Sequence, residues 1–215
     1  MRTSTTPSVT VARAVSDYKA MLARPEIRAA SLAFFMMFLG VSLFIVFMPT
    51  WLERSVGATP NQIAIMFLVG GVANVLSGPQ AGKLSDRIGR KIIILLSCVG
   101  LSIVMALTTF VVRDVRMAYP MFFLTMILVA MRISPFSAML TAMVSDERRG
   151  SLMSLTIALG QVGFAVGAAV AGPLFVKFGY FSNTILGAVF VLAMGVIVWV
   201  AVPEPDGAPQ PDPAG

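Results

Sequence analysis

The chain has 215 residues, of which 57% are hydrophobic and only 12% are charged, against roughly 45–50% and about 25% in ordinary soluble domains. A water-soluble fold could not bury that much apolar surface, so the composition excludes an ordinary soluble protein. Sixteen Lys and Arg residues against ten acids give a net charge of +6, but these bases lie in short clusters and form no basic face, so we expect no nucleic-acid partner.

The chain contains no histidine and a single cysteine, Cys98, which lies inside an apolar run. It can therefore form no intrachain disulfide, and it lacks the Cys and His residues of a structural zinc site. We predict no metal site and no cofactor. Cys98 itself is expected to face lipid or to pack against a neighbouring helix.

Six apolar runs lie between the charge clusters, and each is long enough to cross a bilayer. At 1.5 Å per residue, about 20 helical residues cross the roughly 30 Å of hydrocarbon. Barrel strands would be about ten residues long and would alternate in polarity, so these runs are helices. We predict an all-α membrane protein with six transmembrane helices, at residues 29–52, 61–82, 92–112, 117–140, 151–176 and 180–202.

Two polar segments flank the predicted bundle of residues 29–203. The first, residues 1–28, is basic and is either a disordered linker or a short amphipathic helix on the membrane surface. Its apolar residues at helical spacing are Val11, Val15, Tyr18 and Leu22. The second, residues 204–215, is rich in proline and is predicted to be disordered.

The Lys and Arg residues concentrate on one side of the predicted bundle. Eleven of the sixteen lie before the first span or in the loops after the second and fourth spans, and four lie on the opposite side. Cytoplasmic loops of membrane proteins carry the excess of positive charge. We therefore predict a multi-pass protein of the cell (inner) membrane with both termini in the cytoplasm.

The predicted loop between the second and third spans combines glycine with charge and reads GKLSDRIGRK over residues 82–91. Its two glycines would let helix ends turn tightly and approach their neighbours closely. Asp86 can accept from backbone N–H groups at a helix N-terminus, or pair with Arg87 or Arg90, and so latch one arrangement of the helices. The other interpretation is a loop whose positive charges only fix the orientation.

This loop resembles the G-x-L-x-D-R-x-G-R-K signature of the major facilitator superfamily at every defining position, which are Gly82, Leu84, Asp86, Arg87, Gly89, Arg90 and Lys91. The resemblance implies that these residues form a conformational latch. Leu128–Arg132 in the fourth span and Gly160–Pro173 in the fifth resemble further elements of the family. The chain is similar to the drug and sugar efflux branch, which implies alternating-access transport of a small molecule and no enzymatic activity.

Members of the superfamily have twelve helices in two six-helix halves, with the substrate bound between them. The resemblance therefore implies one half-bundle of a major-facilitator fold, whose partners are the lipid bilayer, the substrate and another six-helix half. The basic segment before the first span resembles a connector between halves, so we interpret the chain as the C-terminal half. The intact signature is the feature that favours the N-terminal half instead.

A truncated gene product fits this pattern, and so does a genuine half-transporter that pairs with itself or with a separately encoded half. The competing function is a six-helix assembly partner, or a remnant, that does not itself transport.

Arg132 is the one charged residue within the predicted spans, since no Asp, Glu or His lies there. An isolated arginine at this depth costs at least about 2.5–3.5 kcal/mol, so it should face the interior. It could contact an anion or a carboxylate in a transport cavity. Otherwise it bonds to carbonyls loosened near Pro135 or snorkels toward an interface. A carboxylate that couples transport to protons would belong to the other half.

Two further polar side chains within the spans, Asn74 and Gln161, could line the cavity or form hydrogen bonds between helices. Gly163 and Gly167 form a GxxxG pair, which predicts close packing of the fifth span against another helix. We predict no catalytic residue, because acid–base chemistry needs titratable groups that these spans lack.

Overall fold

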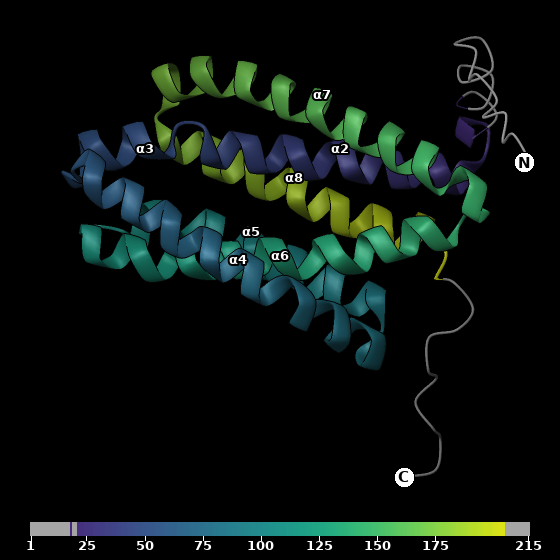
Figure 1. The fold of residues 1–215 in the computed structure, drawn as a ribbon. Helices are drawn as coiled ribbons and strands as arrows, with labels where there is room; N and C mark the ends of the chain where they lie inside the picture. The colour runs from purple at the N-terminus through teal and green to yellow at the C-terminus, as the bar shows by residue number, and fades with distance from the viewer. Residues whose placement is uncertain (1–17, 19–20, 205–215) are drawn as a thin grey trace, which may run out of the picture.

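A computed structural model describes residue 18 and residues 21–204 of the chain. Short turns join its long helices (Figure 1), and no strand occurs in these residues. The elements in chain order are α2 (Pro25–Ile45), α3 (Met48–Trp51), the π-helix η1 (Leu52–Val56), α4 (Pro60–Ile88), α5 (Arg90–Val111), α6 (Val115–Ala142), α7 (Asp146–Phe178) and α8 (Tyr180–Ala201). Six of the helical segments found there could cross a membrane, the first being Pro25–Val56. The predicted all-α membrane protein with six spans is confirmed.

Two predictions fall largely on residues that the structure does not describe. These are the amphipathic helix in the segment before the first span and the disordered tail over residues 204–215, of which only Glu204 is described. Both stay predictions.

Two helices extend well beyond the predicted spans. Helix α4 continues to Ile88 and α7 begins at Asp146. The predicted loop over residues 82–91 is therefore wrong, because α4 and α5 are separated by Gly89 alone. Charged residues mark where a helix leaves the hydrocarbon, but Lys, Arg and Asp remain compatible with a helix that continues into the polar region outside it.

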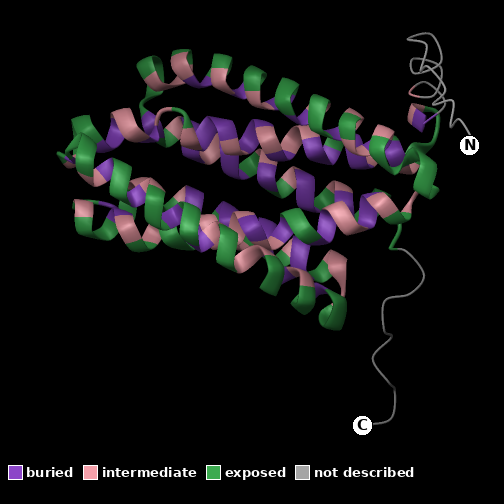
Figure 2. Cartoon of the chain, in the orientation of Figure 1, coloured by how far each residue is buried: buried purple, intermediate pink, exposed green. Residues whose placement is uncertain are grey.

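The principal neighbours in the bundle follow the order α7, α2, α8, α5, α6 and α4. Helix α2 thus packs between α7 and α8, and α5 packs between α8 and α6 (Figure 1). Helices α4 and α7 lie at the two ends of this row. Of the six spans, these two have the smallest share of residues buried inside the bundle (Figure 2). Both therefore present long apolar faces to the surroundings of the bundle.

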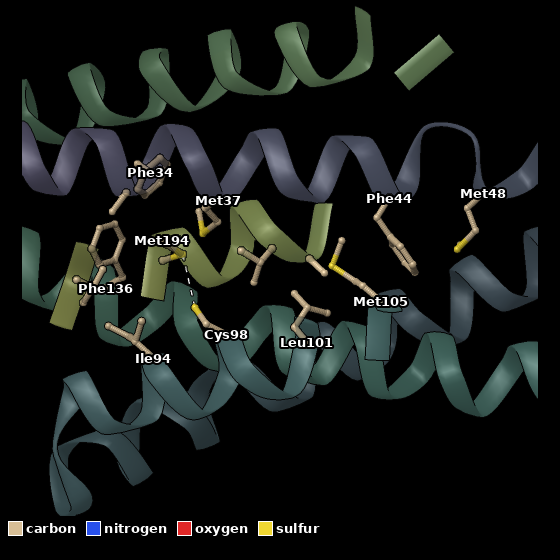
Figure 3. Close-up of a cluster of buried hydrophobic side chains, with 14 of the residues drawn as sticks. Phe34, Met37, Phe44, Met48, Ile94, Cys98, Leu101, Met105, Phe136 and Met194 are labelled. Atoms are coloured by element: carbon tan, nitrogen blue, oxygen red, sulfur yellow. Dashed lines mark hydrogen bonds between the residues drawn. The ribbon is translucent and has the colours of Figure 1, made fainter. Parts of the chain in front are cut away.

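Aromatic and sulfur-containing side chains fill much of the core (Figure 3). Phe34 of α2 stacks on Phe136 of α6, with ring centroids 5.7 Å apart. Cys98 is fully buried, and its Sγ lies 3.8 Å from Met194 Sδ of α8. Of the two environments predicted for Cys98, the structure therefore has packing between helices and not exposure to lipid.

Helix α7 approaches α2 closely through its glycines. A Cβ on Gly163 would collide with the Phe35 carbonyl, and a Cβ on Gly167 would lie 2.6 Å from the Leu39 carbonyl oxygen. Both obstacles are helix backbone, so a side chain at either glycine would push the two helices apart. The GxxxG pair thus lies at the kind of close contact between membrane helices that small residues permit.

Candidate functional site

The signature segment forms the end of α4, a one-residue turn and the start of α5. The turn residue, Gly89, has a φ of 109°, which glycine adopts freely and other residues adopt only with strain. Across this turn Arg90 Nη2 lies 3.2 Å from Asp86 Oδ1. Of the two arginine partners considered for Asp86, the structure therefore has Arg90.

Two reciprocal contacts tie the start of α5 to the end of α8. The backbone N–H of Arg90 donates to Glu204 Oε1 at 3.1 Å, and Lys91 Nζ donates to the Trp199 carbonyl oxygen at 3.1 Å. The first N–H groups and the last C=O groups of a helix have no partner within that helix. Glu204, which lies just beyond the end of α8, therefore caps the start of α5, where Gly89 at the N-cap has no side chain to do so. Lys91 of α5 caps one of the last carbonyls of α8.

The other signature residues divide between packing and exposure. Gly82 lies inside α4 against α6, where a Cβ would come within 2.9 Å of Ser134 Oγ. Gly82 therefore permits a close helix contact and does not end a helix. Leu84 and Arg87 are exposed. The segment thus presents an apolar and a basic side chain at one end of the bundle, beside the α4–α5 turn.

Arg132 lies in the core of the bundle on α6. Its side chain is fully buried, and Nε, Nη1 and Nη2 all lack a hydrogen-bond partner among the described residues. The guanidinium group therefore does not snorkel to an interface, and no carbonyl near Pro135 accepts from it. A positive charge in a core of low dielectric constant is unfavourable unless an acceptor pairs with it.

Neither of the other two predicted cavity residues is hydrogen-bonded to Arg132 in the described part of the chain. Asn74 Nδ2 donates to the Met126 carbonyl oxygen at 3.4 Å, a long hydrogen bond between α4 and α6. Gln161 is exposed on α7, at the opposite end of the helix order. The structure thus places Arg132, Asn74 and Gln161 in three different environments and does not bring them together in one pocket.

Two polar residues at the start of α8 form interhelical hydrogen bonds that the sequence pattern does not predict. Asn183 Nδ2 donates to the Ala171 carbonyl at 3.1 Å, while its buried Oδ1 has no partner in the described part of the chain. The Tyr180 hydroxyl donates to the Phe44 carbonyl at 2.6 Å. At the edge of an apolar run, such residues look like the boundary of a span. Only the packing of α8 against α2 and α7 reveals these partners.

A family model described as Major Facilitator Superfamily matches residues 30–215 of the chain. The chain is also similar to YceJ, an uncharacterized MFS-type transporter of Bacillus subtilis (strain 168), with 26% identity over 194 residues. That alignment covers 87% of the chain and 49% of the relative. The chain thus spans about half the length of the curated relative that it matches.

Proposed function

The chain belongs to the major facilitator superfamily, and we propose that it transports a small solute across the membrane by alternating access, as one six-helix half of a twelve-helix unit. The observation that carries this proposal is a family match that runs through all six spans of the bundle. The relative is about twice as long as the chain, which supports the proposal that the chain is one half of a larger unit, because transporters of this family bind substrate between two six-helix halves.

We propose that the other half packs on the exposed faces of α4 and α7. On α4, Leu68 and Val75 are 67% and 73% exposed. Gly71 and Gly78 have open space where a Cβ would point. Small residues favour the close approach of two membrane helices, so this face suits a protein neighbour better than lipid alone. The occupant is a second copy, a separate chain or another segment of a longer protein.

Arg132 is proposed as the residue that selects a negatively charged group on the substrate. Its unpaired guanidinium supports this role, because an acceptor that reaches Arg132 when the bundle rearranges would remove the cost of an unpaired buried charge. Asn74 and Gln161 are proposed as polar residues of the transport path, the second from its exposed position on α7.

We further propose that residues 82–91 act as a conformational latch, with both termini in the cytoplasm and transport directed outward. The ion pair between Asp86 and Arg90 and the contacts of the segment with α8 support a defined closed arrangement. The assignment of the chain to the C-terminal half stays a prediction.

The proposal is tested with the purified full chain in proteoliposomes, loaded in turn with carboxyfluorescein, ethidium and a radiolabelled sugar. Native mass spectrometry of the same sample reports how many copies assemble. Release of carboxyfluorescein by a two-copy species, and its loss in Arg132→Ala, would support a self-paired transporter with an anionic substrate. Release of ethidium alone would contradict the role of Arg132.

The competing function, an assembly partner that does not transport, predicts a different result. A two-copy species that releases none of the three probes would favour it. If the chain stays monomeric and releases none of the probes, the same assay is repeated with the chain coexpressed with a second six-helix segment. If that complete twelve-helix unit also releases none of the three probes, the transport proposal is overturned.

A further inference from the structure

The first span is interrupted near the end of the bundle opposite the signature segment. Helix α2 ends at Ile45, residues 46–47 bend, and α3 begins at Met48. Figure 3 shows the ribbon arching between Phe44 and Met48. Pro49 in the first turn of α3 explains the break, because it has no N–H to donate to the Ile45 carbonyl and its ring crowds that carbonyl.

The interruption deprives the Phe44 carbonyl of its helical donor, and Tyr180 replaces that donor. In a continuous α-helix this carbonyl would accept from the N–H four residues later, which belongs to Met48. In the structure the Tyr180 hydroxyl at the start of α8 donates to it at 2.6 Å. Phe44 and Tyr180 are 4% and 3% exposed, so this hydrogen bond is shielded from water.

Aromatic contacts hold the segment on both sides of the bend. The Tyr180 ring stacks on Trp51 of α3, with centroids 4.9 Å apart. Phe47, within the bend, stacks on Phe175 near the end of α7 at 5.1 Å. The outer part of the first span is thereby attached to the turn at Gly179 that joins α7 to α8.

We propose that the Phe44 carbonyl is a two-position switch and that Tyr180 is the residue that holds it in the interrupted state. When Tyr180 donates, α2 and α3 are separate helices. When Tyr180 moves away, the Met48 N–H takes the same carbonyl and the two helices join. The buried Phe44 carbonyl has a donor in both states, which are Tyr180 in the interrupted one and the Met48 N–H in the joined one, so the exchange never leaves this carbonyl unpaired.

The switch gives the proposed transport cycle a moving part at this end of the bundle. Residues 48–56 would change direction relative to α2 as the α7–α8 turn shifts, and Trp51 would leave its stack on Tyr180. This consequence rests on the proposed function, whereas the switch itself can be measured without substrate. Tyr180 is a positioning residue, because it acts through the backbone of α2.

Spin labels at the exposed residues Arg28 and Arg54, in a Cys98→Ser background, report the length of the first span by double electron–electron resonance. Tyr180→Phe keeps the aromatic ring and removes only the hydroxyl. We expect it to add a population at longer distance, approaching the roughly 39 Å that 26 residues of continuous helix span at 1.5 Å per residue. An unchanged distance distribution would overturn the proposal.

Tyr119→Phe is the matched control. The Tyr119 hydroxyl also donates to a backbone carbonyl, that of Gln62, at 3.0 Å. Gln62 lies inside α4, where its carbonyl keeps its own helical donor. Removal of this hydroxyl should therefore leave the distances in the first span unchanged, and an equal shift in both variants would contradict the specific role of Tyr180.

A second variant keeps the proposal testable if Tyr180→Phe fails to fold. Pro49→Ala restores the N–H that faces the Ile45 carbonyl and should raise the longer population while Tyr180 is intact. A Pro49→Ala protein with the distances of the unmodified chain would overturn the idea that the two helices can join.

Transport adds an independent readout. In proteoliposomes that release carboxyfluorescein, Tyr180→Phe should change the maximal rate and leave the KM for the dye unaltered, since Tyr180 lies outside the proposed substrate site. A change in KM alone would contradict its role as a positioning residue. A distance shift in a chain that transports none of the probes would uphold the switch and count only against the proposed function.

Discussion

The backbone N–H of Arg90 donates to Glu204 Oε1 at 3.1 Å, although 114 residues of chain separate the two residues. An acid at the start of a helix also interacts favourably with the helix dipole. Glu204 therefore stabilises the start of α5 in a way that Gly89, which has no side chain, cannot. The signature segment is held by α8 within this bundle, independently of any contact that another half provides.

Replacing Glu204 with alanine should lower the free energy of unfolding modestly. The net value of a hydrogen bond is about 0.5–1.5 kcal/mol, and the exposure of this contact places the loss at the lower end of that range. Thermal unfolding of the purified protein in detergent measures the effect. Glu53→Ala is the control, because Glu53 is an exposed acid of η1 for which no hydrogen bond or ion pair is described. Equal losses in the two variants would argue against capping by Glu204.

Gly89→Ala should destabilise the turn between α4 and α5. Gly89 has a φ of 109° and a ψ of 135°, and holding a residue with a Cβ in such a sparsely populated region of positive φ costs about 1–3 kcal/mol. Gly150→Ala offers the opposite expectation, because Gly150 lies inside α7 with open space for a Cβ. That change should stabilise the helix by about 0.5–1 kcal/mol. Unfolding midpoints that move in the same direction for both variants would contradict the glycine-specific turn.

The number of spans can be predicted from the sequence because a long apolar run has one stable outcome in lipid, a helix whose backbone hydrogen bonds are all internal. The ends of the helices cannot be predicted in the same way. Lys83 and Arg148 are charged, yet both are helical, in α4 and α7. Charge is a measure of where the hydrocarbon ends, whereas a helix ends where its backbone must turn, as it does at Gly89.

In the candidate site, a contact between residues close in sequence can be predicted, whereas a contact between residues far apart in sequence cannot. The ion pair of Asp86 with Arg90 spans four residues of chain and follows from residue type and spacing. The hydrogen bond from Tyr180 to Phe44 joins residues 136 apart. Nothing in the local pattern around either residue indicates that contact, because it depends on how α8 packs against α2.

Gly163→Ala should weaken the packing of α7 against α2. The added Cβ would meet the Phe35 carbonyl, and backbone cannot move aside as a flexible side chain can. Overpacking of this kind costs about 1–3 kcal/mol. Gly172→Ala in the same helix is the matched control, because its Cβ would lie 3.4 Å from a ring atom of Phe47, an ordinary contact. Thermal unfolding should separate the two variants, and equal midpoints would contradict the close approach of the helices at Gly163.

Arg132→Leu should stabilise the folded bundle, although most substitutions in a protein core destabilise it. The guanidinium group is fully buried and has no described acceptor. Removing a charge at membrane depth avoids a cost of at least about 2.5–3.5 kcal/mol. The cavity left by the shorter leucine side chain offsets part of this gain in stability. The free energy of unfolding in detergent or in bilayers is the measurement.

Arg149→Leu is the control for loss of a positive charge, because Arg149 pairs with Asp146 at 2.9 Å on an exposed surface. Exposed ion pairs of this kind contribute about 0–1 kcal/mol, so its effect should be small. A large loss of stability in Arg132→Leu would mean that the folded protein supplies an acceptor to Arg132. The guanidinium would then be a structural group, and the reason for assigning it to an anionic substrate would be removed.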